Sequence, residues 1–479
     1  WDLSIMGVAV AVGAGIFSVG AQAAAFHAGP AVIISFLIAG IVCGAAVMCY
    51  AEFASMIPVA GSAYTFTYTT VGEIMAWIIG WDLILEMLMA GSVISKYWGV
   101  YLNDFMRLMG WNANTNLTFG SFHIDIAPII IVAFFTTLLV FGTKIGARVD
   151  GAMTVLKIAI VFFVVIVGFF YVKASNFTPF IPPSQPASTV EGSSAVTGVM
   201  TQPLWQFATG MTPSVYGVPG ILSGAALVFF AFIGFDVVAT ASEETKNPHK
   251  NVPLGIGVGM LLIIVMYMLV AVVTTGMVSY ADLAKQDSPS LATAFELVGA
   301  DWAAKIISFG IVLGLATVVM VLLLGLTRIV FAMSRDGLLP RGLSKTGKHG
   351  TPAALQIVVG AVVALVAAFF DIGVLSDMVN IGTLSAFTLV AISIPIMRKK
   401  RPDLPRAFKM PGSPWIPILI AVANFWLMLN LSVLTWIRFV VWLVVGFAIY
   451  FGYGYWHARL GKGDLTETLS AETDKAVNG

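Results

Sequence analysis

The feature that most limits what this chain can fold into is a series of apolar segments. A helix needs about 20 mainly apolar residues to cross the hydrocarbon layer of a bilayer. Gly and Pro interrupt many of the segments, which membrane helices tolerate where neighbouring helices satisfy the freed backbone groups. The sequence therefore predicts an all-α membrane protein with about 12 transmembrane helices. The twelve segments are 3–25, 30–55, 74–105, 125–142, 149–173, 220–243, 253–279, 302–333, 353–371, 376–397, 414–434 and 436–457.

Charged residues are too few to cover a water-facing surface. They make up 10% of the 479 residues, against 59% hydrophobic residues, whereas a soluble domain carries about a quarter charged residues. The surface is therefore expected to face lipid, in one membrane domain rather than several soluble ones. The net charge of +1 indicates neither a nucleic acid nor an acidic partner.

The distribution of Lys and Arg predicts the orientation in the membrane. With a cytoplasmic N-terminus, the inner loops and the start of the C-terminal tail, counted as far as Lys462, hold sixteen of these residues. Cytoplasmic loops carry the excess of Lys and Arg, so both termini of this multi-pass protein are predicted to be cytoplasmic, in the plasma membrane. The outer loops hold only five: Arg107, Lys173, Lys285, Lys305 and Arg438.

The predicted segments divide the chain into two groups of five helices and a remainder. The segment 174–219 is rich in Ser, Thr, Pro and Gly, contains no Lys or Arg, and is expected to be an extracellular loop. Because five is odd, the second group must cross the membrane with the opposite topology. The expected units are a first inverted repeat 1–173, the loop 174–219, a second inverted repeat 220–397, spans 11 and 12 in 398–458, and a cytoplasmic tail 459–479.

Spans 1 and 6, which open the two groups, are both interrupted near the middle. Span 1 contains Gly13-Ala14-Gly15, and span 6 contains Gly234-Phe235-Asp236. Paired interruptions in two inverted halves indicate a transporter binding site, because unwound backbone offers N–H groups to a carboxylate and carbonyls to an ammonium group. The alternative is that the small residues only let helices approach closely.

Lys157 is the single charged residue in the apolar segments that most strongly indicates a function. It is nine residues beyond Arg148 and eight beyond the start of the apolar segment at 149, which is about 12 Å into the membrane at about 1.5 Å per residue. An ammonium group at this depth is costly and usually faces the interior of a helix bundle. Lys157 is therefore a candidate proton carrier, or a fixed cation that bonds to the carbonyls of span 1. A snorkelling side chain is the alternative.

Acidic side chains in the apolar segments allow several roles. Glu86, well inside span 3, could balance Lys157, could contact a cationic substrate, or could be protonated and bonded to a neighbouring helix. Asp236 is a candidate site residue because it lies at the break in span 6. Glu52 and Glu73 lie near inner helix ends, where solvated or helix-terminus roles are expected.

Motifs for other classes of protein are missing from the sequence. It contains no G-x-x-x-x-G-K-[ST] phosphate-binding loop, which argues against direct use of ATP. H-E-x-x-H and G-x-S-x-G patterns are also missing, so neither a protease nor a hydrolase is supported. We expect no enzymatic activity, no catalytic residues, no cofactor and no metal site.

Several motifs together resemble the amino acid–polyamine–organocation (APC) superfamily, over spans 1 to 10. The motif in span 3 is similar to the cationic amino acid transporter branch in particular. The motifs are Gly13–Phe17, Ala28–Ala31, Tyr50–Glu52, Pro58–Tyr64, Gly80–Glu86, Phe232–Asp236 and Lys246–Pro253.

The resemblance implies a 5+5 inverted-repeat (LeuT-like) fold with broken helices 1 and 6, two extra helices and alternating access. It places the substrate carboxylate at the N–H groups of Ala14, Gly15 and Ile16. The substrate amino group would meet carbonyls near Val12 and from Phe230 through Ala231 to Ile233.

The resemblance also assigns roles to single side chains. Phe230 matches an aromatic gate that covers the substrate. Lys157 matches the span 5 lysine that replaces a sodium site in proton-coupled members. Met320 in span 8 would face the pocket and leave less room for a long cationic side chain.

The function predicted from the sequence is secondary active transport by alternating access. It is proton-coupled uptake of cationic or small neutral L-amino acids, with Lys157 and Glu86 as the proton-coupling residues. The partners are the substrate, protons and the lipid bilayer, without nucleic acid; protein partners are not indicated. The first alternative is amino acid exchange without net proton movement. The second is a sensor or channel with the same fold.

Overall fold

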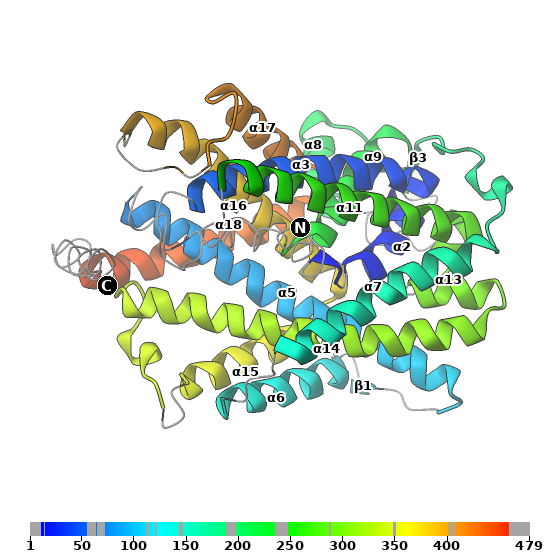
Figure 1. The fold of residues 1–479 in the computed structure, drawn as a ribbon, viewed down its shortest axis with the longest axis horizontal. Coiled ribbons are helices and arrows are strands. Elements are labelled where there is room, and N and C mark those ends of the chain that lie inside the picture. Colours follow the sequence, from blue (N-terminus) through cyan, green and yellow to red (C-terminus); the bar gives the residue numbers. More distant parts are fainter. Residues whose placement is uncertain are drawn as a thin grey trace.

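The structure is a computed structural model of the chain, and it consists almost entirely of helices. Most of them run roughly parallel to one long axis (Figure 1). The described residues are 11–13, 15–54, 64, 72–111, 115–119, 122–142, 147–187, 198–234, 248–286, 289–347, 351–400, 402, 406 and 408–458.

Seven helical stretches in this part of the chain are long and apolar enough to cross a bilayer, and four shorter apolar helices accompany them. The prediction of an all-α, multi-pass membrane protein is confirmed, while the exact number of twelve spans stays a prediction. The long stretches are Gly20–Glu52, Glu73–Leu108, Gly151–Phe169, Lys250–Met277, Asp301–Arg335, Ile372–Lys400 and Val433–His457. The shorter helices are Ile126–Val140, Gly217–Phe232, Ala353–Phe369 and Trp415–Leu429.

The helices of the first half include two π-helices and one 3₁₀ turn near the beginning of the chain. Gly29 has a φ of 61° and is followed by Pro30, so the chain turns there between η2 and α3. In order the elements are η1 (Gly15–Val19), α2 (Gly20–Ala23), η2 (Ala24–Ala28), η3 (Gly29–Ala31), α3 (Val32–Ala54), α5 (Glu73–Leu108), α6 (Ile126–Val140) and α7 (Ala147–Phe169).

The second half begins with a helix that narrows to a 3₁₀ turn. Serine side chains cap three of its helices: Ser279 caps α12, Ser290 caps α13 and Ser432 caps α18, each accepting a backbone N–H, as N-cap residues do. The elements are α9 (Gly217–Val228), η7 (Phe229–Phe232), α11 (Pro248–Met277), α12 (Tyr280–Ala284), α13 (Leu291–Leu297), α14 (Asp301–Arg335), η9 (Arg341–Ser344), α15 (Ala353–Phe369), α16 (Ile372–Lys400), α17 (Trp415–Leu429), α18 (Val433–Ile449), η10 (Tyr450–Gly454) and α19 (Tyr455–His457).

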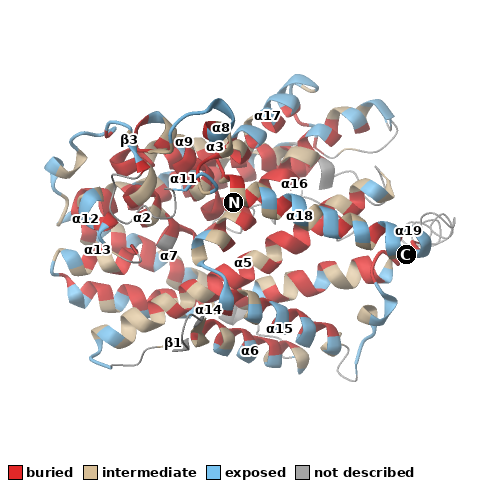
Figure 2. Ribbon diagram, turned by 180° about the vertical axis from the view of Figure 1, so that it is seen from behind, coloured by how far each residue is buried: buried red, intermediate tan, exposed pale blue. Residues whose placement is uncertain are grey.

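Short elements occupy the connections that were predicted to be extracellular. A hairpin pairs β1 (Asn116–Phe119) with β2 (Phe122–Asp125), and β3 (Gln185–Pro186) pairs with β4 (Ser214–Val215). The segment 174–219 also holds η4 (Ala174–Phe177) and α8 (Leu204–Thr209). In Figure 2, α12 and α13 lie at one end of the molecule and α19 lies at the other.

Helix α5 lies at the centre of the packing, against α14 and α16 along much of its length, and it is largely buried (Figure 2). Glycines allow the close approach: a Cβ on Gly80 would come within 2.9 Å of the Met333 sulfur of α14. Large apolar side chains on peripheral helices face outward, among them Val155, Phe162, Ile166, Leu261 and Val444. A buried centre with an apolar outer face fits a protein that lipid surrounds.

Candidate functional site

The first predicted break lies at the start of the described chain. Val12 and Gly13 form a bend, and the helix continues from Gly15 as the π-helix η1. π-helical turns inside α-helices occur often at functional sites. Ala14 lies outside the described residues. Span 1 is therefore interrupted at the position that its glycines predict.

The second predicted break follows η7. Ile233 is extended, with φ −64° and ψ 140°, and Gly234 has a φ of 95°. Glycine adopts such a positive φ without the strain that a Cβ would cause. Asp236 lies outside the described residues. The helix of span 6 thus ends at Phe232, as the sequence predicts.

The two breaks are in direct contact. A Cβ added to Gly15 would overlap the Cα of Ala231 and would lie 2.7 Å from its Cβ and 2.8 Å from its backbone nitrogen. Only a residue without a side chain fits there, so Gly15 lets η1 touch the backbone of η7. Backbone groups beside the bend of span 1 and beside the end of η7 are therefore gathered in one place.

Tyr267 of α11 links the two interrupted helices. Its hydroxyl lies 2.6 Å from the carbonyl oxygen of Ala11 and 2.9 Å from that of Ala231. The ring is fully buried and packs on the rings of Phe36 and Phe232. A hydroxyl has one hydrogen to donate, so the two carbonyls share this donor. Tyr267 could not be predicted as a site residue from the sequence, because a single Tyr in an apolar helix carries no signal of its partners.

Two further side chains hold backbone carbonyls of these helices. The hydroxyl of Tyr101 on α5 donates to the carbonyl oxygen of Phe17 in η1. The thiol of Cys43 on α3 lies 3.9 Å from the carbonyl oxygen of Phe232 in η7. The neighbourhood of the breaks therefore receives donors from helices α3, α5 and α11.

Most of the predicted substrate-binding residues that are described lie in the interior. Val12 and Ile16 are buried on one side of the contact, and Phe230 and Ala231 are buried on the other. The side chains of Ile233 and Met320 are half-buried and pack against the same core. None of these six side chains is polar, so polar recognition at the breaks depends on backbone groups. The six residues are Val12, Ile16, Phe230, Ala231, Ile233 and Met320.

Lys157 of α7 is 5% exposed, and its aliphatic stem packs against Gly314 of α14. A Cβ on Gly314 would come within 2.7 Å of Lys157 Cγ and 3.3 Å of its Cδ. The side chain therefore lies in the contact between α7 and α14 rather than on the outer face of α7.

Glu86 is 2% exposed, and its backbone lies where α5 packs on α16. Its backbone nitrogen lies 3.7 Å from the position of a Cβ on Gly382 of α16. The two predicted proton-coupling residues are thus both buried, Lys157 against α14 and Glu86 against α16.

Glu52 lies near the end of α3, and the structure excludes one of its two expected roles, the solvated one. It is completely buried, so the expectation of a solvated side chain is wrong. Arg398 donates two hydrogen bonds to its carboxylate, at 2.9 and 2.6 Å, and the backbone N–H of Met410 donates a third at 2.7 Å. Glu73, half-buried at the first residue of α5, accepts a hydrogen bond from Tyr450 at 2.8 Å. These contacts tie α3 and α5 to the chain near the ends of α16 and α18.

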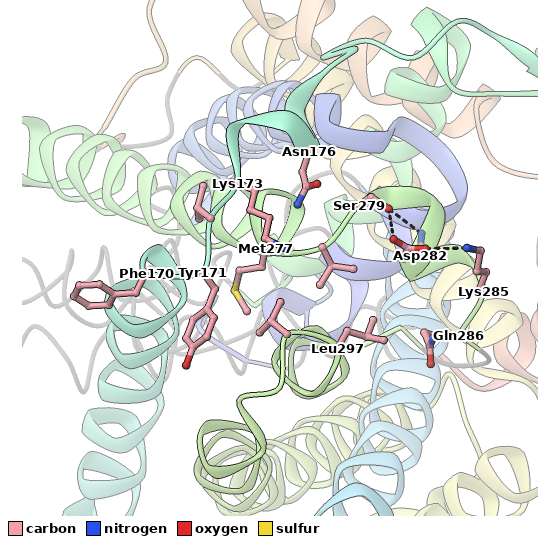
Figure 3. A pocket seen from close by; sticks show the side chains of 13 residues that line it. Phe170, Tyr171, Lys173, Asn176, Met277, Ser279, Asp282, Lys285, Gln286 and Leu297 are labelled. Atoms are coloured by element: carbon pink, nitrogen blue, oxygen red, sulfur yellow. Dashed lines mark hydrogen bonds and ion pairs between the residues drawn. The ribbon is translucent and has the colours of Figure 1, made fainter.

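A cavity of about 650 Å³ opens at the far end of α11, near α12 and α13 (Figure 3). Asp282 accepts hydrogen bonds from Lys285 at 2.8 Å and from Ser279 at 2.7 Å, which lower the pKa of its carboxyl group below the usual value. None of the predicted site residues lines this cavity. It is lined by Phe170, Tyr171, Val172, Lys173, Asn176, Met277, Val278, Ser279, Asp282, Lys285, Gln286, Leu297 and Val298.

Within the described part of the chain, no group of three or more His, Cys, Asp or Glu side chains is placed to hold a metal ion. The polar chemistry around the breaks consists of backbone groups, hydroxyls and single buried charges. The described residues thus form a multi-pass helical protein in which the bend at Val12 and Gly13 and the end of η7 at Phe232 lie close together in the apolar interior.

Comparison with known proteins identifies the family. The family model for amino acid permeases matches residues 1–453, so the chain belongs to the amino acid permeases of the APC superfamily, and the resemblance seen in the sequence is confirmed.

Three relatives illustrate the range of this family. The chain is 42% identical to the branched-chain amino acid permease BcaP of Bacillus subtilis, over 96% of the chain and 94% of the relative. It is 38% identical to the methylthioribose transporter of the same organism, with the same shares covered. It is 35% identical to the vacuolar cationic amino acid transporter 4 of Arabidopsis thaliana, over 84% of the chain and 63% of the relative.

Proposed function

We propose that this permease takes up amino acids across the plasma membrane by proton-coupled alternating access. The observation that carries the proposal is the contact between Gly15 and Ala231, which gathers backbone groups from two interrupted helices. The first N–H groups of a helix have no partner within that helix, so those around Ala14, Gly15 and Ile16 suit the substrate carboxylate. Carbonyls from Phe230 to Ile233 suit its ammonium group.

The substrate side chain would lie among apolar groups. Ile16 and Phe230 are buried at the breaks, and half-buried Met320 packs against the same apolar core. These apolar side chains favour small neutral or branched aliphatic substrates. The name of one Bacillus relative, a branched-chain amino acid permease, agrees with this preference. Buried Glu86 favours a cationic side chain instead, as in the relatives named cationic amino acid transporters.

Uptake of labelled leucine, alanine and arginine by wild type and by Glu86→Gln decides between these substrate classes. If Glu86 contacts a cationic side chain, the variant loses arginine uptake and keeps that of the neutral substrates. If all three substrates change alike, or none does, Glu86 is not the specificity residue.

Lys157 is the residue proposed to couple transport to protons. Its side chain is enclosed between α7 and α14, where a charge is costly unless it is paired. Gain and loss of the lysine proton would therefore bias the packing of these two helices, and a proton gradient would drive accumulation.

The test is uptake into proteoliposomes with and without an inward proton gradient, comparing wild type with Lys157→Ala. The matched control is Lys285→Ala, since the Lys285 side chain is 60% exposed. The proposal expects that Lys157→Ala abolishes gradient-driven accumulation and retains substrate binding, while the control behaves like wild type. Wild-type uptake that ignores the gradient and is stimulated by internal substrate would instead show an exchanger.

The proposed orientation places both termini in the cytoplasm. The orientation is supported by the excess of Lys and Arg on the loops that are predicted to be cytoplasmic. One such cluster is the basic end of α16, at Arg398, Lys399 and Lys400. In whole cells, a single cysteine introduced at exposed Lys285 would react with a membrane-impermeant maleimide, whereas one introduced at Lys399 would not. The reverse labelling pattern would overturn the orientation.

A further inference from the structure

Helix α5 carries a second buried carboxyl group, one turn before Glu86. Asp82 is 1% exposed, and its Oδ2 atom lies 2.6 Å from the Ser385 hydroxyl of α16. Among the described residues, its Oδ1 atom has no hydrogen-bond partner. The carboxyl group of Asp82, in the middle of an apolar bundle, therefore has a single hydroxyl as its hydrogen-bond partner. This is unusual for an ionised carboxylate, because a buried charge normally has an opposite charge and several hydrogen-bond donors beside it.

The hydroxyl of Ser385 has two possible partners and one hydrogen. It lies 2.9 Å from the carbonyl oxygen of Gly382 in its own helix, as well as 2.6 Å from Asp82. If Asp82 is ionised, Ser385 must donate to the carboxylate and leave Gly382. If Asp82 is protonated, the carboxylic acid donates to Ser385 and the serine donates to Gly382, so both short contacts are hydrogen bonds.

The protonated arrangement is the one that this packing favours. An ionised carboxylate here would have one donor, and a buried charge without sufficient hydrogen bonds is strongly disfavoured. Glu86 lies four residues further along α5, on the same face. Two carboxylates at this spacing in an apolar interior repel each other, which also disfavours ionisation of both.

Charged groups on the surrounding helices do not replace the missing donor. The helices packed against α5 are α6, α14, α15, α16 and α18, and α6 and α15 contain no ionisable residue. Arg328 of α14 is exposed. Arg438 of α18 interacts with Asp377, which lies near the first residue of α16. Tyr64 packs beside Gly80, and Tyr50 packs on Phe387 of α16. The other charged residues of these helices are Glu73, Lys96, Asp104 and Arg107 on α5, Asp301, Lys305 and Arg335 on α14, and Arg398, Lys399 and Lys400 on α16.

We propose that Asp82 is a second proton-binding group of this transporter, and that its proton stabilises the contact between α5 and α16 at Ser385. The proposal rests on the proposed proton-coupled function. It gives the transporter a second proton-binding residue, a carboxyl group, besides Lys157. In the packing described here Asp82 holds its proton. A conformation in which α16 moves from α5 admits water to the carboxylate and releases that proton, so the two packings differ in bound protons.

Infrared spectroscopy can detect whether the Asp82 carboxyl group is protonated, without a transport assay. Infrared spectra of the reconstituted protein would be recorded over a range of pH for wild type, Asp82→Asn and the control Asp282→Asn, in which an exposed carboxyl group is removed. We expect a carbonyl stretching band of a protonated carboxyl group at neutral pH that only Asp82→Asn lacks. A wild-type spectrum without a band that depends on Asp82 would overturn the proposal.

A transport test distinguishes a proton-coupling role from a purely structural one. The amide of Asp82→Asn can still donate to Ser385, so this variant is expected to bind substrate and to exchange internal for external substrate at rates close to wild type. Its gradient-driven accumulation is expected to fall at least about tenfold. Unchanged accumulation would show that the proton on Asp82 is structural only.

Ser385→Ala provides a second variant that keeps the carboxyl group. Without the Ser385 hydroxyl, the ionised form of Asp82 loses more stabilisation than the neutral form does, because hydrogen bonds to charged groups are stronger than those between neutral groups. The pH midpoint of the infrared band is therefore expected to rise by about one unit; an unchanged or lower midpoint contradicts the inferred hydrogen bond. If wild-type uptake ignores the proton gradient but the band and its shift are present, the proposed proton coupling fails, and Asp82 remains a proton-binding group without a transport role.

Discussion

Replacement of Gly15 by Ala tests whether the contact between the two interrupted helices forms the substrate site. The new Cβ would overlap the Cα of Ala231 and would lie 2.7 Å from its Cβ. Non-bonded carbon atoms normally approach to about 3.5–4.0 Å, so η1 and η7 would have to separate by about 1 Å. The obstructing atoms belong to the backbone and the Cβ of Ala231, so no rotation of a side chain can relieve the overlap.

The expected cost is that of overpacking, about 1–3 kcal/mol. If the substrate carboxylate binds the N–H groups around Gly15, a displacement of this size changes the distance of every backbone contact in the site. At about 1.4 kcal/mol for each factor of ten, substrate affinity should fall about tenfold to a hundredfold. Uptake at low substrate concentration should fall by the same factor.

Equilibrium binding of labelled leucine and alanine to purified protein, together with thermal unfolding in detergent, measures both effects. The matched control is Gly257→Ala in α11, where an added Cβ meets no atom within 4 Å and alanine favours the helix by up to about 1 kcal/mol. The control should bind like wild type and unfold at the same or a higher temperature. Binding by Gly15→Ala within about threefold of wild type would show that the site lies elsewhere.

Three further predictions concern stability. Tyr267→Phe removes the donor shared by two buried carbonyls and should destabilise the protein by about 1–3 kcal/mol, measured by thermal unfolding; an unchanged midpoint would contradict the bridge. Glu52→Gln breaks a buried ion pair and should cost about 3–5 kcal/mol in the same assay, and a loss below about 1 kcal/mol would argue against it. The pKa of Asp282 is lowered, chiefly by Lys285, so its contribution is present above the unfolded value of about 3.9 and is lost as the pH falls through the folded value. Asp282→Asn should therefore cost less than about 1 kcal/mol at neutral pH, and a cost that persists at acidic pH would refute the assignment.

The helical architecture could be predicted because its causes are local. The segment 74–105 corresponds to α5 (Glu73–Leu108) and the segment 302–333 to α14 (Asp301–Arg335), with ends that differ by a few residues. Lipid requires about 20 apolar residues per crossing, and this requirement is visible in any window of the sequence. The breaks at Gly13–Gly15 and Gly234 could be predicted for the same reason, since glycine marks them locally.

The partners of the buried polar groups could not be predicted. Tyr267 and Ala11 are separated by 256 positions in the sequence, Asp82 and Ser385 by 303, and Glu52 and Arg398 by 346. Periodicity was no guide, because these helices are apolar on nearly every face. The depth of a charged residue in the membrane can be counted from the end of its helix. The neighbouring helix that its side chain contacts cannot be predicted in this way.

The sequence by itself therefore determined that the chain forms membrane-spanning helices, where two of them are interrupted, and which charges lie within them. The tertiary structure decided that Gly15 meets Ala231, that Lys157 packs on Gly314, and that Asp82 has Ser385 as its partner. The physical reason is that helix formation in lipid depends on each segment separately. The neighbours of a helix and its rotation depend on the packing of all the helices together.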